Sequence, residues 1–96
     1  MNDLLIKRNN KINEYAVYAK DTNNISINID KCISDSKNLQ EIIFHELMHY
    51  YINEYRNKMS NEENIVIVAT NCYMWSIKHM SEIINKLIYK GEYRCH

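Results

Sequence analysis

Hydrophobic and polar residues alternate with two different periods along this chain, and the change of period separates two regions. In segment 25–30 isoleucine alternates with polar residues, the pattern of a strand with one buried face. Segment 14–20 is rich in aromatic and small apolar residues and predicts another strand, and the Asp-Thr-Asn-Asn sequence at 21–24 is typical of a turn. We therefore expect an antiparallel hairpin, with segment 4–8 adding a strand or a first helix.

The second region has the period of helices. Between residues 37 and 56 apolar side chains recur at steps of three and four, after N-cap candidates at 34–36. The sequence Ser-Asn-Glu-Glu at 60–63 has the form of a capping box and opens a further helix. Its run 65–69 is apolar on every side, which predicts burial on most sides. Segment 81–90 places its apolar residues on one face and predicts a closing amphipathic helix.

These elements predict an α+β fold in a single domain, 1–96. An N-terminal antiparallel β-hairpin or small sheet packs on a central helix, and two further helices follow. A chain of 96 residues has room for one small core.

Composition narrows the class of protein. The chain is 46% hydrophobic and 25% charged, with twelve basic and twelve acidic residues, so a basic nucleic-acid binder is disfavoured. One glycine and no proline leave no material for a glycine-rich phosphate loop. The three cysteines are odd in number and widely spaced, which indicates reduced thiols, with Cys32 and Cys72 as small core residues. The N-terminal apolar run is too short for a signal peptide and no run is long enough to span a membrane, so we expect a cytoplasmic protein.

The sequence His45-Glu46-Leu47-Met48-His49, an H-E-x-x-H motif, lies within the first predicted helix. Its two histidines are one helical turn apart, so their side chains point the same way and both imidazoles can reach one ion. Glu46 lies beside them, placed to accept a proton from a water bound to that ion. The residues around the motif are mainly apolar, which argues against a pair of solvated histidines. The motif predicts a zinc site with Glu46 as the catalytic residue.

A catalytic zinc ion takes three protein ligands and keeps one position open. The sequence after the motif lacks the glycine and histidine of metzincins, and His79 and His96 lie far along the chain. The preferred third ligand is an acidic residue at the start of the next helix, either Glu62 or Glu63. Adjacent residues on a helix point about 100° apart, so only one of the two can face the ion. Because Glu63 would bond back to Ser60 in the capping box, we favour Glu62.

Over residues 14–78 this pattern resembles the small phage and mobile-element zinc peptidases related to the ImmA/IrrE family. The shared features are a strand with an Ile-x-Ile pattern, the motif helix, and an acidic start to an apolar helix. In that family the glutamate ligand is followed six and seven places on by a large apolar residue and an alanine, and Val68 and Ala69 stand at these distances from Glu62. Segment 15–20 lacks the glycine often seen in the family's first strand. The resemblance implies a gluzincin-like zinc metallopeptidase that acts on a protein or peptide substrate, with strand 25–30 as the edge to which an extended substrate adds.

The expected mechanism combines Zn²⁺ with Glu46. The ion lowers the pKa of a water, and Glu46 accepts its proton and passes it to the leaving amine. Four tyrosines near the motif are candidates for a hydrogen bond to the developing oxyanion, and the sequence selects none of them: Tyr50, Tyr51, Tyr55 and Tyr73.

Two rival functions are open. The first is a non-catalytic zinc-stabilised interaction module, with Cys72 or His79 closing the fourth position. The second is a metal-free adaptor that acts through exposed aromatic residues such as Trp75.

Overall fold

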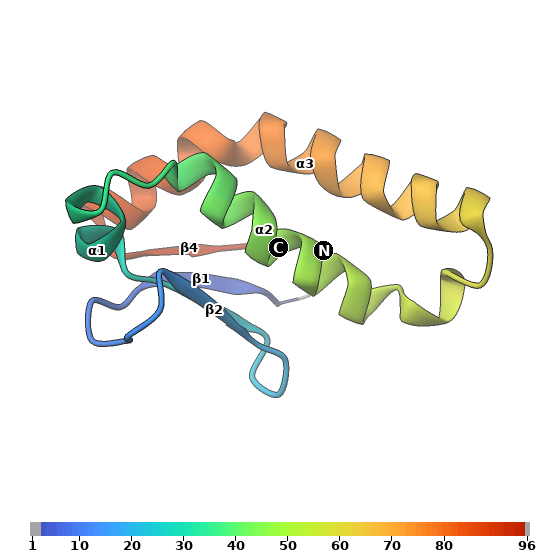
Figure 1. Cartoon of the computed structure of the whole chain (residues 1–96), viewed down its shortest axis with the longest axis horizontal. Coiled ribbons are helices and arrows are strands. Elements are labelled where there is room, and N and C mark those ends of the chain that lie inside the picture. Colours follow the sequence, from blue (N-terminus) through green and yellow to red (C-terminus); the bar gives the residue numbers. More distant parts are fainter. Residues whose placement is uncertain (1–2, 96) are drawn as a thin grey trace.

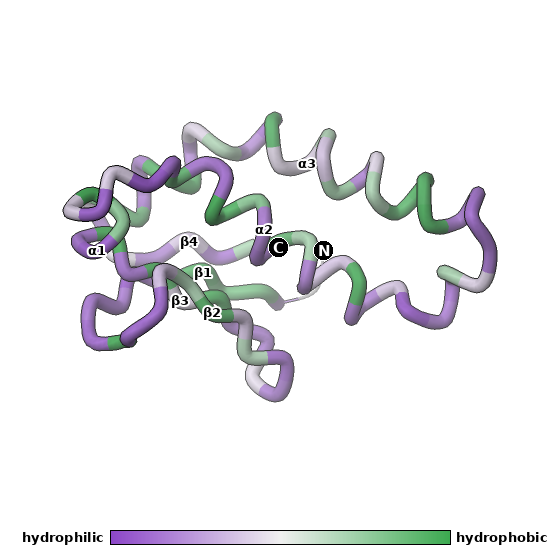
Figure 2. The backbone as a smooth tube through the Cα atoms, in the orientation of Figure 1, coloured by the Kyte–Doolittle hydropathy of each residue, from purple (hydrophilic) through white to green (hydrophobic). Residues whose placement is uncertain are grey.

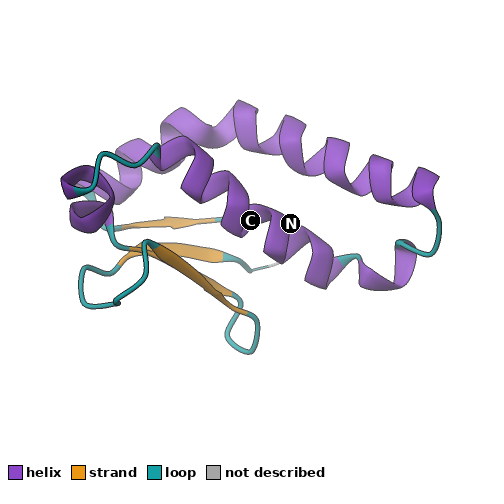
Figure 3. Cartoon of the chain, viewed as in Figure 1, coloured by secondary structure: helices purple, strands orange, loops and turns teal. Residues whose placement is uncertain are grey.

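The computed structural model describes residues 3–95 and confirms the α+β fold class. Two long helices lie on one face of a small sheet, as Figures 1 and 3 show. In chain order the elements are β1 (Leu5–Arg8), β2 (Ala16–Ala19), β3 (Asn24–Ile27), α1 (Ile29–Ser34), α2 (Leu39–Glu54), the 3₁₀ turn η1 (Arg56–Lys58), α3 (Glu62–Tyr89) and β4 (Glu92–Arg94).

The sheet has four strands in the order β2-β3-β1-β4. The predicted hairpin is present: β2 pairs antiparallel with β3, and the turn between them has Asn23 in the left-handed region at φ 57°. Segment 4–8 is the strand β1, which pairs parallel with β3 on one side and antiparallel with β4 on the other. Strand β4 has no counterpart among the predicted elements.

The prediction that strand 25–30 is the substrate edge is wrong. Strand β3 ends at Ile27 and lies between β2 and β1, so both of its sides are paired. Asn28 then stops the strand and starts α1, because its side chain accepts a hydrogen bond from the backbone N–H of Lys31. The edge strands are β2, which lies beside α2, and β4, which lies beside α3.

Both long helices begin at an asparagine. The side chain of Asn38 caps α2 by accepting from the N–H of Glu41, so the candidates at 34–36 do not serve as caps. Asn61 caps α3 by accepting from the N–H of Asn64, in the place where the sequence suggested Ser60. The capping box that assigned Glu63 to the backbone is therefore not formed.

The two helices predicted after α2 are one continuous helix, α3. Its buried residues recur at steps of three and four through the region where a break was expected: Val68, Cys72, Ser76, Met80, Ile83 and Leu87. The Ser76 hydroxyl donates to the Cys72 carbonyl at 2.7 Å, which satisfies this buried polar group within the helix. A polar residue thus sits on the buried face without ending the helix.

One hydrophobic core lies between the sheet and the two helices. The largest fully buried side chains come from every layer and include Leu4, Ile6, Ile25, Ile27, Ile43, Leu47, Tyr50, Ile83 and Leu87. Figure 2 shows the hydrophobic positions of β1 and β3 beneath the helices. The three cysteines are free and buried, as expected for Cys32 and Cys72, and burial raises the pKa of Cys72 to about 11 and that of Cys95 to about 12.

The prediction that the apolar run 65–69 is buried on most sides is wrong. Ile65, Val66 and Ile67 are 45%, 51% and 48% exposed. The first turns of α3 extend past the sheet and lie against the end of α2, so only one side of the helix is covered there (Figure 1). Among the described residues, no helix is long and apolar enough to cross a lipid bilayer.

Candidate functional site

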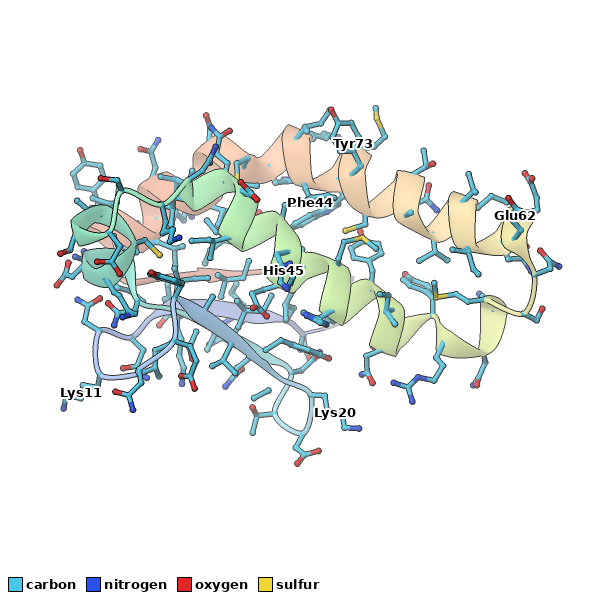
Figure 4. All side chains as sticks on the ribbon, viewed as in Figure 1. Lys11, Lys20, Phe44, His45, Glu62 and Tyr73 are labelled. Atoms are coloured by element: carbon cyan, nitrogen blue, oxygen red, sulfur yellow. The ribbon has the colours of Figure 1, made fainter. Side chains whose placement is uncertain are left out.

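The middle of α2 carries the two histidines of the motif on one face, as the spacing predicted. The Nε2 atoms of His45 and His49 lie 3.2 Å apart, and the two ring centroids are separated by 4.9 Å. Both side chains are exposed, so the expectation from the apolar flanks that these histidines are not solvated is wrong, and Figure 4 shows His45 projecting from the middle of the helix. The imidazoles therefore present two nitrogen atoms to solvent at one point.

This separation fits two ligands of a single ion. Two nitrogens bound to a tetrahedral zinc ion at its usual bond length lie about 3.3–3.4 Å apart. The observed 3.2 Å is within a few tenths of an ångström of that value without any change of rotamer. The two imidazoles thus have the spacing that two ligands of one zinc ion would need.

Glu46 faces the opposite way from solvent, toward the sheet. Its side chain is only 9% exposed and lies near the backbone N–H of Tyr18 in β2. Burial raises the pKa of the Glu46 carboxyl above its ordinary value, while the neighbouring imidazoles of His49 and His45 and the Tyr18 N–H oppose the shift. A carboxylate held in this way, next to an open site, is suited to exchange protons.

A continuous groove runs between β2 and α2 and passes over Glu46. Its central hollow of about 240 Å³ is lined by Ala16, Val17, Tyr18, Glu46 and His49. A larger hollow of about 490 Å³ adjoins it and shares Ala16 and Glu46. A smaller hollow of about 190 Å³ adjoins the other end and shares Tyr18 and His49. Together the three hollows follow the whole length of the edge strand.

The backbone of β2 is available to this groove. Because β2 is the last strand of the sheet, only one of its sides is paired, to β3. The N–H of Tyr18 lies near the Glu46 carboxyl, which indicates that the unpaired side of β2 faces α2. An unpaired strand edge beside a hollow can add an extended peptide by main-chain hydrogen bonds.

Glu62, the predicted third ligand, does not lie with the imidazole pair. The ring of Phe44, next to His45 in sequence, contacts the ring of Tyr73 with centroids 6.1 Å apart, so the middle of α3 is level with the motif. Glu62 precedes Tyr73 by eleven residues, about 16 Å along the helix axis. Figure 4 shows Glu62 at the far end of α3, and both it and Glu63 are exposed.

No third ligand comes from elsewhere in residues 3–95. In this part of the chain no group of three His, Cys, Asp or Glu side chains is arranged to hold a metal ion. Cys72 is fully buried in the core, and His79 stacks on Trp75 with ring centroids 4.4 Å apart. His96, the other candidate, lies outside the described residues.

A second large hollow lies at the opposite edge of the sheet, between α3 and β4. It measures about 540 Å³ and its lining includes Trp75, His79 and Cys95. Of its three cations, Lys86 and Arg94 pair with the carboxylates of Glu82 and Glu92 at 4.0 and 3.6 Å, and Lys90 forms no ion pair with the described residues. Four of the charged side chains that line this hollow are therefore paired with one another.

None of the four candidate tyrosines is placed as a donor to the groove. Tyr50 and Tyr51 are buried, with Tyr50 packed edge-on against Tyr18. Tyr55 stacks on Tyr51, and Tyr73 lies on α3 against Phe44. The structure therefore selects none of these four tyrosines as an oxyanion donor.

The sequence missed two features of the site. The Tyr18 contact to Glu46 is made by a backbone N–H, which leaves no signal in residue type. The positions of Lys20 and Arg56, which line the smallest hollow of the groove, depend on how β2 lies against α2.

Comparison of the chain with protein-family models, with curated proteins and with solved structures finds no match.

Proposed function

We propose that this protein is a zinc-dependent peptide hydrolase whose active site is the middle of the β2–α2 groove. The observation that supports it best is the joint placement of three groups: two imidazole nitrogens 3.2 Å apart, a buried carboxylate between them and β2, and an unpaired strand edge along the same groove. Each group alone is common in proteins, but their coincidence at one point corresponds to the parts that hydrolysis of a peptide bond requires.

His45 and His49 would hold the ion through their Nε2 atoms. When bound, zinc supplies Lewis acidity to a peptide carbonyl and makes water acidic enough to be deprotonated near neutral pH. Glu62, the third ligand expected from the sequence, is exposed at the far end of α3, so the proposal assigns it no part in holding the ion. The remaining positions are otherwise open to water and substrate.

Glu46 acts as the proton carrier. Its carboxylate accepts a proton from the attacking water, and the new bond forms between the water oxygen and the carbonyl carbon. The same carboxyl then gives that proton to the nitrogen of the breaking amide bond, so that an acid and an amine leave.

Strand β2 orients the substrate. An extended peptide that hydrogen-bonds to the unpaired side of β2 would lie along the groove and cross Glu46 at its central hollow. Antiparallel addition is slightly more stable per residue than parallel addition. We therefore expect the substrate to run opposite to β2, with its N-terminal part near Lys20.

The experiment is cleavage of an unfolded protein by the zinc-loaded chain, followed by mass spectrometry. Wild type should cut, and Glu46→Gln should lose about 10²–10⁴-fold in rate while keeping its zinc and its fold. Glu82→Gln is the control, because Glu82 is exposed on α3 and lines none of the three hollows of the groove. Equal cleavage by wild type and Glu46→Gln would refute the proposal.

A further inference from the structure

The two ends of the groove carry opposite charge. The smallest hollow, at the His49 end, is lined by Lys20 and Arg56. The largest hollow, at the His45 end, is lined by Glu14 and Glu41, together with Lys31. The central hollow between them contains no charged residue other than Glu46 and His49. A peptide lying along β2 would therefore meet cations on one side of Glu46 and mainly carboxylates on the other.

The cations at the His49 end are not neutralised by the protein. In the described part of the chain neither Lys20 nor Arg56 forms an ion pair, whereas Lys31 at the other end pairs with Asp35 at 3.8 Å. Glu54, a carboxylate on this side of α2, does not line the hollow. Figure 4 shows Lys20 at the end of β2, where the groove ends.

The carboxylates at the His45 end strengthen the contrast. Glu14 and Glu41 are exposed and form no ion pair with the described residues. The cation of this hollow, Lys31, lies over the ring of Tyr15 at 5.1 Å from its centroid, in addition to its pair with Asp35. A negative substrate group is thus repelled at one end of the groove and attracted at the other.

We propose that Lys20 and Arg56 form a specificity site that selects acidic residues, so that the substrates of this protein are acidic peptides. The inference rests on the proposed function for the role of the groove as a substrate site. A hollow of about 190 Å³ accommodates one side chain, and two flexible cations beside it can pair with a carboxylate there. Charge complementarity of this kind governs which peptide is chosen more than how tightly any peptide binds.

The test is binding, measured by fluorescence anisotropy at low ionic strength, to the Glu46→Gln variant, which does not turn over. The probes are two labelled nine-residue alanine-and-valine peptides, one with two glutamates and one with two lysines at the same positions. The glutamate peptide should bind about tenfold more tightly, and the difference should shrink when salt is raised. Chelator-treated wild type serves as a second binding-competent form without turnover.

Charge reversal provides the control. Lys20→Glu with Arg56→Glu should abolish or invert the preference for the glutamate peptide. Lys11→Glu with Lys78→Glu makes the same change of net charge at exposed positions outside the groove and should leave the preference intact. Figure 4 shows Lys11 in the loop before β2, at the other end of that strand from Lys20.

Equal binding of the two peptides, absence of any peptide binding, or a preference that survives the Lys20 and Arg56 reversal would each overturn the inference. Failure of the proposed function gives a different result. In that case the glutamate peptide is still preferred and the preference still depends on Lys20 and Arg56, but zinc-loaded wild type cuts neither peptide.

Discussion

The sequence assigns a glutamate in the middle of α2 and a glutamate in the first turn of α3 to one zinc site. In the structure the two side chains differ in exposure and in their neighbours. Glu46 is 9% exposed and lies near the Tyr18 N–H of β2, with the two imidazoles beside it. Glu62 is exposed, at the end of a helix that extends past the sheet. The periodicity of one helix places Glu46 relative to His45 and His49, whereas the position of Glu62 depends on how two helices pack.

The difference has a physical origin in the core. The middle of α2 is covered on its inner side by the sheet and by α3, so its side chains have defined partners. The first turns of α3 lie against α2 alone in Figure 1 and leave isoleucine and valine side chains half exposed. In a region with few contacts, the orientation of the side chains is only weakly constrained.

The largest expected effect separates the two glutamates in catalysis. Replacing both Glu62 and Glu63 by glutamine should leave the rate of peptide cleavage within about twofold, against the loss of about 10²–10⁴-fold expected for Glu46→Gln. The reason is that Glu62 lies about 16 Å along α3 from Tyr73, the residue that is level with Phe44 just before the motif. A loss of activity in the Glu62 and Glu63 variant comparable to that of Glu46→Gln would show that the first turn of α3 reaches the imidazoles.

Substitutions in the middle of α2 and near the start of α3 should also differ in their effect on the free energy of unfolding. Leu47 in the middle of α2 is fully buried, so Leu47→Ala should lower the free energy of unfolding by about 2–5 kcal/mol. Ile65 near the start of α3 is 45% exposed, and Ile65→Ala should change it by less than about 0.5 kcal/mol. Urea denaturation of both variants measures the contrast, and a cost of several kcal/mol for Ile65→Ala would mean that this surface is covered.

Alkaline pH should lower the free energy of unfolding through the buried Cys72 thiol. Burial raises the pKa of Cys72 from its ordinary 9.0 to about 11, so the unfolded state releases this proton first as pH rises. The contribution of the protonated Cys72 thiol to the free energy of unfolding is complete below about pH 9 and is lost as pH approaches about 11. We expect a fall of about 1 kcal/mol in the free energy of unfolding between these limits, after allowance for solvent screening.

The control for this prediction is Cys72→Ala. Its free energy of unfolding should fall less steeply with pH over the same range. An identical slope in both proteins would assign the alkaline effect to other groups.

The smallest effect concerns the start of α3. Asn61→Ala should cost about 1 kcal/mol, because the Asn61 side chain accepts from the N–H of Asn64 at 2.9 Å. Ser60→Ala should be close to neutral, since Ser60 is not the cap. Thermal unfolding of the two variants decides between the observed cap and the capping box expected from the sequence, which predicts the reverse order.

Local features of the fold could be predicted from the sequence. The hairpin follows from the period of two in segment 25–30 and the Asx-rich turn, and α2 follows from its period of three to four. The shared face of His45 and His49 follows from the helical repeat alone. Each of these depends on residues within one or two turns of chain.

Features set by long-range packing could not be predicted. That β2 and not β3 is the edge depends on β1 pairing with β3 across sixteen or more residues of chain. The continuity of α3 depends on burial of Ser76 against the rest of the core, and the exposure of Ile65 depends on where the sheet ends. The backbone contact of Tyr18 to Glu46, and the cations Lys20 and Arg56 beside it, follow from the same arrangement.

The central claim is that the imidazoles of His45 and His49 bind zinc, and zinc titration of the purified protein tests it most directly. Wild type should bind about one zinc ion per chain, and His45→Gln with His49→Gln should remove that binding while the fold is kept. Glu62→Gln should bind zinc within about twofold of wild type. Zinc binding unchanged in the histidine variant, or no zinc binding by wild type, would contradict the account.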